Sequence, residues 1–352
     1  MLQTKQRIAW LDIAKAITIL LVVFGHTLRG GTTFKIVYSF HVATFFLLSG
    51  MTCKTDQLKE RIKKDVLRIL VPYYCFSVLS ILIFFFLGNF AADKLGISVD
   101  TSLWNNLKEM FYGCPVRERL KYNMPLWFLP CLFATKMLYY GLNKLCKEKP
   151  IQILVWSLVL AAVGVTYTRL GGPGLPFNLS VALKMLFFFS LGRVLFPHLD
   201  LLEKWQLQGA KAIVLGVLIL LVTGIVAYLA PKVDYADDSF PNFATFLITA
   251  ITGSFGVCFL SIGIGNCKVL EYVGMNTLAI LVMHKFPVLL FQTVGPQASL
   301  FNQDDSVLKI TLALTVSLIS IGLCLIAGQI IQRCFPFLLG DIHKHRQWIR
   351  RS

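Results

Sequence analysis

Three ionisable side chains lie in one apolar stretch near the start of the chain: Asp12, Lys15 and His26. In a helix, the step from Lys15 to His26 is a rotation of about 1100°, or roughly 20° beyond full turns. Both side chains therefore share a face, about 16 Å apart along the axis. Asp12 precedes Lys15 by about one turn, so these two can pair. Charged groups are costly inside a membrane, so we expect this face to line a bundle interior or a wet cavity. Snorkelling of Lys15 and helix capping by His26 would explain each residue alone, but not their alignment.

Histidines supply the acid–base chemistry that such a cavity could support. His41 follows His26 after a short glycine-containing stretch, so we expect both imidazoles near the same outer depth. Histidine has a pKa of about 6.5, so either ring can take up a proton at physiological pH. The pair also suggests a metal, but no third ligand has suitable spacing, and no metal is expected. Other polar residues in or beside apolar stretches are Tyr122, Asn123, Trp127, Asn276 and His284.

The elements that must position these residues are apolar helices. The chain of 352 residues is 56% hydrophobic and 15% charged, whereas soluble domains average about 45–50% and about 25%. This composition excludes an ordinary soluble enzyme, a disordered chain and a disulfide-stapled secreted domain. A membrane span needs about 20 apolar residues. We therefore predict a single all-α, polytopic integral membrane domain over residues 1–352, with about ten transmembrane helices. They lie near 8–28, 34–53, 67–89, 123–143, 151–168, 178–196, 211–230, 242–264, 273–294 and 307–333.

The net charge of +16 would suggest nucleic acid as a partner if the protein were soluble. When lysines and arginines are assigned to alternate loops, 20 fall on the side of the two termini and 9 on the other side. The positive-inside rule then predicts that both termini are cytoplasmic. The excess charge thus mostly records orientation in a lipid bilayer, and no nucleic-acid partner is expected.

Four segments resemble motifs of the integral-membrane acyltransferase 3 family. They are RIAWLDIAKAITILLVVFGHT (7–27), FHVATFFLLSG (40–50), PLWFLPCLF (125–133) and GMNTLAILVMH (274–284). The closest branch is the fucose 4-O-acetylase-like group, which modifies surface polysaccharides. The resemblance implies a core of ten transmembrane helices and covers nearly the whole chain.

The resemblance also implies roles for individual residues. The family's basic-x10-His motif maps onto Lys15 and His26, and the resemblance implies a catalytic set of His26, Lys15 and His41, with His26 as general base. A basic cluster at the start of the third span would hold the phosphates of acetyl-CoA; it comprises Arg61, Lys63, Lys64 and Arg68. The family's RxxR appears only as Arg61-x-x-Lys64 or as a lone Arg68. Positioning of the acceptor or of the base would fall to Asp12, Tyr122, Asn123, Trp127, Asn276 and His284.

The leading hypothesis is an O-acyltransferase of the bacterial cytoplasmic (inner) membrane. It would move an acetyl or another acyl group from cytosolic acetyl-CoA to a hydroxyl of a surface polysaccharide or lipid-linked sugar. Acetyl-CoA is then a co-substrate, the acceptor is a carbohydrate, and no permanently bound cofactor is expected. Direct transfer, an acyl-histidine intermediate and a homo-oligomer are all left open. The alternative is a secondary transporter or exporter, which needs no acyl-CoA. A scaffold without chemistry would leave the alignment of Lys15 with His26 unexplained.

Overall fold

A computed structural model describes residues 8–95, 102–116, 119–198, 207–293, 301 and 306–341, and these form helices joined by short connections. The first half contains α1 (Ala9–Leu28), α2 (Thr32–Tyr38), α3 (His41–Met51), α4 (Leu58–Asp65), α5 (Val71–Leu95), α6 (Leu103–Tyr112), α7 (Phe128–Leu145) and α8 (Pro150–Arg169). The second half contains α9 (Leu179–Leu195), α11 (Gly209–Leu229), α12 (Phe243–Ile264), α13 (Lys268–Met275), α14 (Thr277–Met283), α15 (Lys285–Thr293) and α16 (Val307–Cys334). A π-helical turn, Val66–Leu70, joins α4 to α5.

Eight helical stretches among the described residues are long and apolar enough to cross a membrane. They are 9–28, 32–51, 58–86, 150–169, 176–198, 209–229, 243–264 and 307–334. The prediction of an all-α, multi-pass membrane protein is therefore confirmed, with eight of the ten expected spans found as long apolar helices. Residues 1–7 and 342–352 lie outside the described residues, so the predicted cytoplasmic location of the termini stays a prediction.

The two remaining expected spans take other forms. The stretch expected at 123–143 begins with a 3₁₀ turn, Met124–Trp127, and continues as α7. The stretch expected at 273–294 is broken into α13, α14 and α15. Pro287 explains the second break, because it has no N–H to donate to the carbonyl of Met283, and its ring crowds that carbonyl. At the first break, the Asn276 side chain donates to the Tyr272 oxygen at 2.8 Å and so competes with the helix's own hydrogen bonds.

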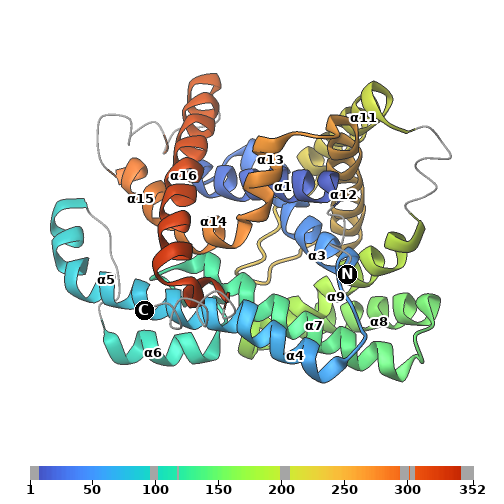
Figure 1. Cartoon of the computed structure of the whole chain (residues 1–352), viewed down its shortest axis with the longest axis horizontal. Helices are drawn as coiled ribbons and strands as arrows, with labels where there is room; N and C mark the ends of the chain where they lie inside the picture. Colours follow the sequence, from blue (N-terminus) through green and yellow to red (C-terminus); the bar gives the residue numbers. More distant parts are fainter. Residues whose placement is uncertain are drawn as a thin grey trace.

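The helix α1 lies inside the bundle, where it packs against α3, α12, α13 and α16 (Figure 1). Its contact with α13 is unusually close, since a Cβ added at Gly274 would lie 1.8 Å from the carbonyl oxygen of Asp12. Small residues allow such backbone approach between helices in membranes. Hydrogen bonds add specificity, with Thr27 Oγ1 3.1 Å from Ser317 Oγ of α16. The polar stripe of α1 is therefore held in a fixed place.

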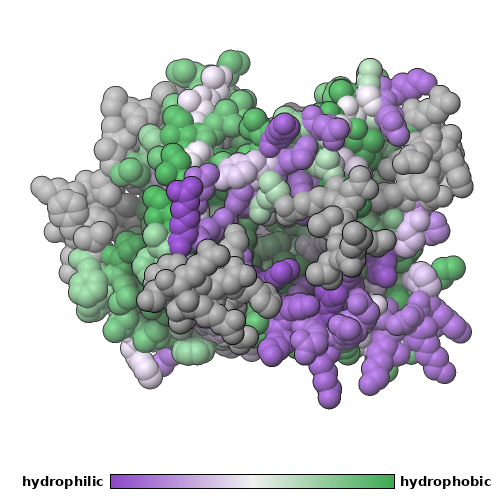
Figure 2. All heavy atoms as spheres, in the orientation of Figure 1, coloured by the Kyte–Doolittle hydropathy of each residue, from purple (hydrophilic) through white to green (hydrophobic). Residues whose placement is uncertain are grey.

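Hydrophilic side chains gather over α4 and the neighbouring α7–α8 end of the face in Figure 2, whereas green apolar surface is prominent on the opposite side, around α5 and α16. The α4 segment, LKERIKKD, is the most strongly charged of the described helices. Exposed large apolar side chains are instead frequent on α8, α11 and α16. This division suits helices that contact lipid and a basic end that contacts water and lipid headgroups.

Candidate active site

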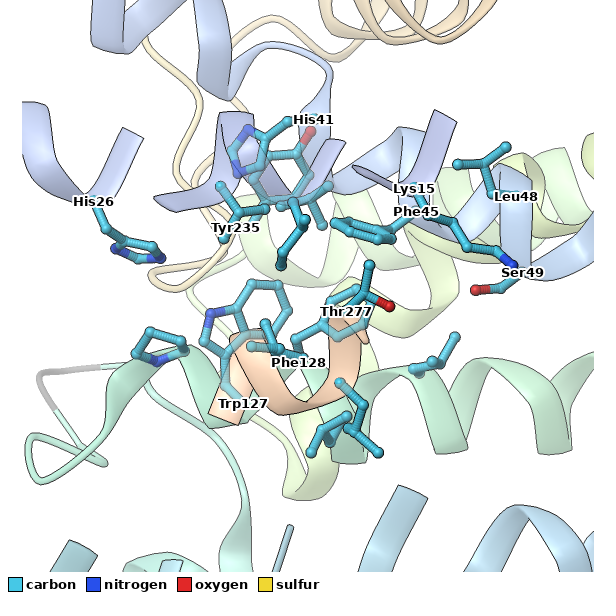
Figure 3. A pocket seen from close by; sticks show the side chains of 18 of the residues that line it. Lys15, His26, His41, Phe45, Leu48, Ser49, Trp127, Phe128, Tyr235 and Thr277 are labelled. Carbon is cyan, nitrogen blue, oxygen red and sulfur yellow. The ribbon is translucent and has the colours of Figure 1, made fainter. Parts of the chain in front are cut away.

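A cavity of about 470 Å³ follows one face of α1. Asp12, Lys15, Ile19, Val22 and His26 line it, at the three- and four-residue steps of a single helix face. Figure 3 shows Lys15 and Ser49 at one end of the view and His26 at the other. We call these the Lys15 end and the His26 end. The cavity thus contains both residues that the spacing on α1 placed on a common face.

At the Lys15 end, the ammonium group of Lys15 lies 3.0 Å from the carboxylate of Asp12. The Lys15 side chain is still 27% exposed, so a ligand in the cavity can reach it. Arg68 also lines this cavity and comes from the π-helical turn. Two cationic side chains from separate helices therefore face the same space.

The π-helical turn is held from both sides. At its start, the Asp65 carboxylate pairs with the Lys136 ammonium and accepts a hydrogen bond from the Tyr140 hydroxyl at 2.7 Å. On the other side, Gly340 packs against the backbone of Leu67 and Arg68, with φ +75°. π-helical turns frequently mark functional sites because they change the register of a helix. Here the turn directs Arg68 to the cavity.

The other basic residues predicted to bind the donor lie elsewhere. Arg61, Lys63 and Lys64 are on α4 and do not line the cavity. Arg61 lies 3.5 Å from Asp56, and Lys63 and Lys64 are exposed. Of the predicted basic cluster, the structure brings only Arg68 together with Lys15. The other three can act only on the surface beside the cavity.

Three histidines meet near the His26 end. His26 and His41 line the cavity, and the ring centroid of His284 lies 5.2 Å from that of His26. His41 Nδ1 lies 2.8 Å from the Val37 carbonyl oxygen, and His284 Nδ1 lies about 3 Å from the carbonyls of Ile280 and Leu281. Because carbonyl oxygens only accept, both Nδ1 atoms carry the proton. In the neutral form of each ring, Nε2 is then the proton acceptor.

His26 itself is fixed by neighbours on two other elements. The Tyr38 hydroxyl is 3.5 Å from His26 Nδ1. Gln292 of α15 donates to the carbonyl oxygens of His26 and Thr27 at 3.0 and 2.9 Å. These carbonyls end α1 and have no partner within the helix. Gln292 therefore secures the end of α1 on which His26 stands.

Of the remaining predicted site residues, one lines the cavity and the others are packed behind it. Trp127 lines the cavity, with Phe128 beside it (Figure 3). Tyr122 and Asn123 are fully buried outside the lining, and Asn123 donates to Ser80 and to the Val282 carbonyl. Asn276 accepts a hydrogen bond from Gln332 at 3.0 Å and, like His284, lies outside the lining.

Several lining residues were missed by sequence reasoning. Tyr38 could have been found, since it lies on the apolar stretch of His41, one helical step before it. Asp234 and Tyr235 come from the connection between α11 and α12, where nothing in the sequence indicates a return into the bundle. Burial raises the pKa of the Tyr235 phenol, so its hydroxyl stays protonated.

Within the described residues, no group of three or more His, Cys, Asp or Glu side chains is arranged to hold a metal ion. Fold and cavity together define a multi-pass membrane protein with cationic and histidine side chains facing one internal space. A family model described as an acyltransferase domain, that of the acyltransferase 3 family, matches residues 8–329. The chain belongs to this family and is a membrane acyltransferase. No significant match was found among curated proteins or solved structures.

Proposed function

We propose that the protein moves an acetyl or another small acyl group from acetyl-CoA to a hydroxyl of a surface polysaccharide or lipid-linked sugar. The observation that carries this proposal is one cavity along α1 that holds two cationic side chains, Lys15 and Arg68, together with His26 and His41. In this proposal two substrates enter such a space from opposite sides and meet inside it. The motifs of the fucose 4-O-acetylase-like branch support a sugar as the acceptor.

The Lys15 end suits the donor. Acetyl-CoA carries several phosphates, and arginine and lysine are the usual partners of phosphate in proteins. Beyond Lys15, the wall is mainly apolar, with Ile19, Val22, Phe45 and Leu48. A slender pantetheine arm fits along such a wall. Over the distance of about 16 Å that the helix spacing gives, the thioester would reach His26.

The His26 end suits the chemistry. A sugar hydroxyl is a weak nucleophile at neutral pH and needs a general base. In the direct reaction, His26 takes the hydroxyl proton while the sugar oxygen attacks the thioester carbonyl carbon. The carbon–sulfur bond then breaks, and the proton passes from His26 to the departing thiolate. The Tyr38 hydroxyl beside His26 Nδ1 would hold the ring in place during this exchange.

The predicted orientation agrees with this division. With both termini cytoplasmic, the Lys15 end faces the cytosol, where acetyl-CoA is made, and the His26 end faces the outer side. The proposed location is the bacterial cytoplasmic membrane. The reaction would then supply acetylated surface sugars from a cytosolic donor, without export of acetyl-CoA.

The test compares wild-type protein with His26→Ala and with His198→Ala, an exposed histidine outside the cavity. Each variant is expressed at equal level in cells whose surface glycans are analysed for O-acetyl groups by mass spectrometry. We expect acetylation with wild type and His198→Ala and none with His26→Ala. Full acetylation by His26→Ala would refute the role of His26. Purified protein that shows no thermal shift with acetyl-CoA would favour a transporter instead.

A further inference from the structure

The connection between α11 and α12, residues 230–242, folds back into the bundle and forms part of the cavity wall. Asp234, Tyr235 and Ala236 line the cavity together with Tyr38 and His41. We call these three residues the loop tip. Tyr235 is 1% exposed, and its ring centroid lies 6.1 Å from that of His41 (Figure 3). A connection between two apolar helices thus reaches the His26 end.

The loop tip has a fixed shape. Asp234 and Ser239 exchange two backbone hydrogen bonds at 2.9 and 2.7 Å. Within this turn, the Asp234 carboxylate accepts from the backbone N–H groups of Ala236 and Asp237 at 3.1 and 3.3 Å. The other carboxylate oxygen is 3.3 Å from the Lys232 ammonium. Oδ1 thus accepts two hydrogen bonds, whereas Oδ2, which faces only the Lys232 ammonium, keeps lone-pair capacity for one more.

A buried ion pair anchors the loop to the bundle. Lys184 of α9, whose side chain is 1% exposed, lies 2.5 Å from Asp238 Oδ1. It also donates to Thr168 Oγ1 at 2.8 Å, and Thr168 in turn donates to Asp238 Oδ2 at 2.8 Å. A charged lysine inside an apolar bundle is costly unless it is paired and hydrogen-bonded. Lys184, Thr168 and Asp238 form what we call the loop anchor, which ties the loop to two helices, α8 and α9.

The walls around the loop tip have the chemistry of a sugar site. Phe34, Tyr38, Trp127 and Tyr235 present aromatic surface at the cavity. Aromatic walls with a few placed polar groups are typical of small-molecule sites, and aromatic faces pack well on the C–H faces of sugar rings. Among the described residues, Asp234 and Asp12 are the carboxylates that line the cavity, and Asp12 is engaged with Lys15 at the other end. A carboxylate here accepts from hydroxyls and repels anions.

We propose that the loop tip recognises the acceptor, with Asp234 accepting hydrogen bonds from hydroxyls beside the one that is acylated, and that the loop anchor positions it. This inference rests on the proposed function and adds the class of acceptor, a neutral sugar with neighbouring hydroxyls. Asp234 and Tyr235 set specificity in this scheme. Lys184 and Asp238 are positioning residues that do not touch either substrate.

The experiment measures transfer kinetics of purified protein in lipid nanodiscs, with acetyl-CoA and two acceptors, a neutral methyl glycoside and the matching uronic acid. The variants are Asp234→Asn and Lys184→Met. The control is Asp237→Asn, the same change at an exposed position that does not line the cavity. Loss of a hydrogen bond to a charged group weakens binding by about tenfold or more. For Asp234→Asn we therefore expect KM for the glycoside to rise about tenfold.

The KM values for acetyl-CoA and for the uronic acid distinguish a loss of acceptor recognition from a general loss of protein structure. KM for acetyl-CoA should stay within about twofold of wild type, and the uronic acid should gain relative to the glycoside, because the repelling charge is gone. Lys184→Met should raise KM for the glycoside in the same selective way. Unchanged glycoside KM in Asp234→Asn overturns the inference, and so does an equal rise in both KM values. Absence of any transfer by wild type would instead reject the proposed function.

Discussion

The loop anchor makes a sharp energetic prediction, because its two charges are buried together. The side chains of Lys184 and Asp238 are 1% and 6% exposed. Removing one partner leaves an uncompensated charge in an apolar interior, which costs about 3–5 kcal/mol. We expect this loss of stability in Lys184→Met and, with the ammonium left behind, in Asp238→Asn. The double variant has no buried charge, and its asparagine oxygen can still accept from Thr168.

The double variant should therefore be far more stable than the two single changes suggest. Replacing a buried ion pair with neutral groups is often close to neutral, so we expect a cost of about 1 kcal/mol. The coupling between the two positions then amounts to about 5 kcal/mol or more, well above the usual error of additivity for independent sites. Few pairs of positions would give a coupling of this size.

Reversible unfolding in mixed micelles, followed by circular dichroism, gives the four free energies of the cycle. A thiol-reactive fluorogenic dye gives an independent melting temperature, because six of the nine cysteines are buried and become reactive on unfolding. The reasoning is refuted if the double variant loses the sum of the two single losses. Such additivity would mean that the two charges do not compensate each other.

Three further predictions concern Gly274, Arg68 and Asp65. Gly274→Ala should cost about 3 kcal/mol by forcing α13 away from Asp12. Gly141→Ala, where a Cβ meets nothing within 4 Å, should stabilise α7 by about 0.5–1 kcal/mol in the same unfolding titration. Arg68→Gln should raise the Kd for acetyl-CoA about tenfold in equilibrium binding. Lys63→Gln, at an exposed position outside the cavity, should raise it only about twofold. Equal effects of the two changes would place the donor outside the cavity. Asp65→Asn should both lower the melting temperature and weaken acetyl-CoA binding. A lower melting temperature with unchanged acetyl-CoA binding would mean that the π-helical turn does not position Arg68.

The sequence predicts the helices of this protein well because lipid imposes one simple requirement. Every long apolar stretch must satisfy its backbone internally, so its length and hydropathy are enough to identify a helix. Once the first apolar stretch is identified as a helix, the spacing of Lys15 and His26 places both side chains on one face of α1. The exceptions carry helix-breaking residues. Pro287 divides the stretch expected at 273–294, and Asn123 precedes the 3₁₀ turn in the stretch expected at 123–143.

The candidate site was only half visible in the sequence, for a physical reason. The basic run from Arg61 to Arg68 suggests a single donor cluster, but the helical turns of α4 and the π-helical turn after it point most of the run away from the cavity. Only Arg68 reaches the cavity. The loop tip was not foreseen at all, because its position depends on Lys184 and Asp238, which are 54 residues apart. Contacts of this kind leave no local pattern.

Two lysines within apolar helices show how the structure distinguishes a lysine that can bind a ligand from one that only stabilises the fold. In the sequence, Lys15 and Lys184 are equally costly and thus equally strong candidates for function. Both pair with an aspartate, at 3.0 and 2.5 Å. Their exposure decides between them, since the Lys15 side chain is 27% exposed and faces the cavity, whereas that of Lys184 is 1% exposed and is enclosed by its partners. A ligand can therefore compete with Asp12 for Lys15 but cannot reach Lys184. Changes at Lys15 should act on the donor, and changes at Lys184 on the acceptor through the loop tip.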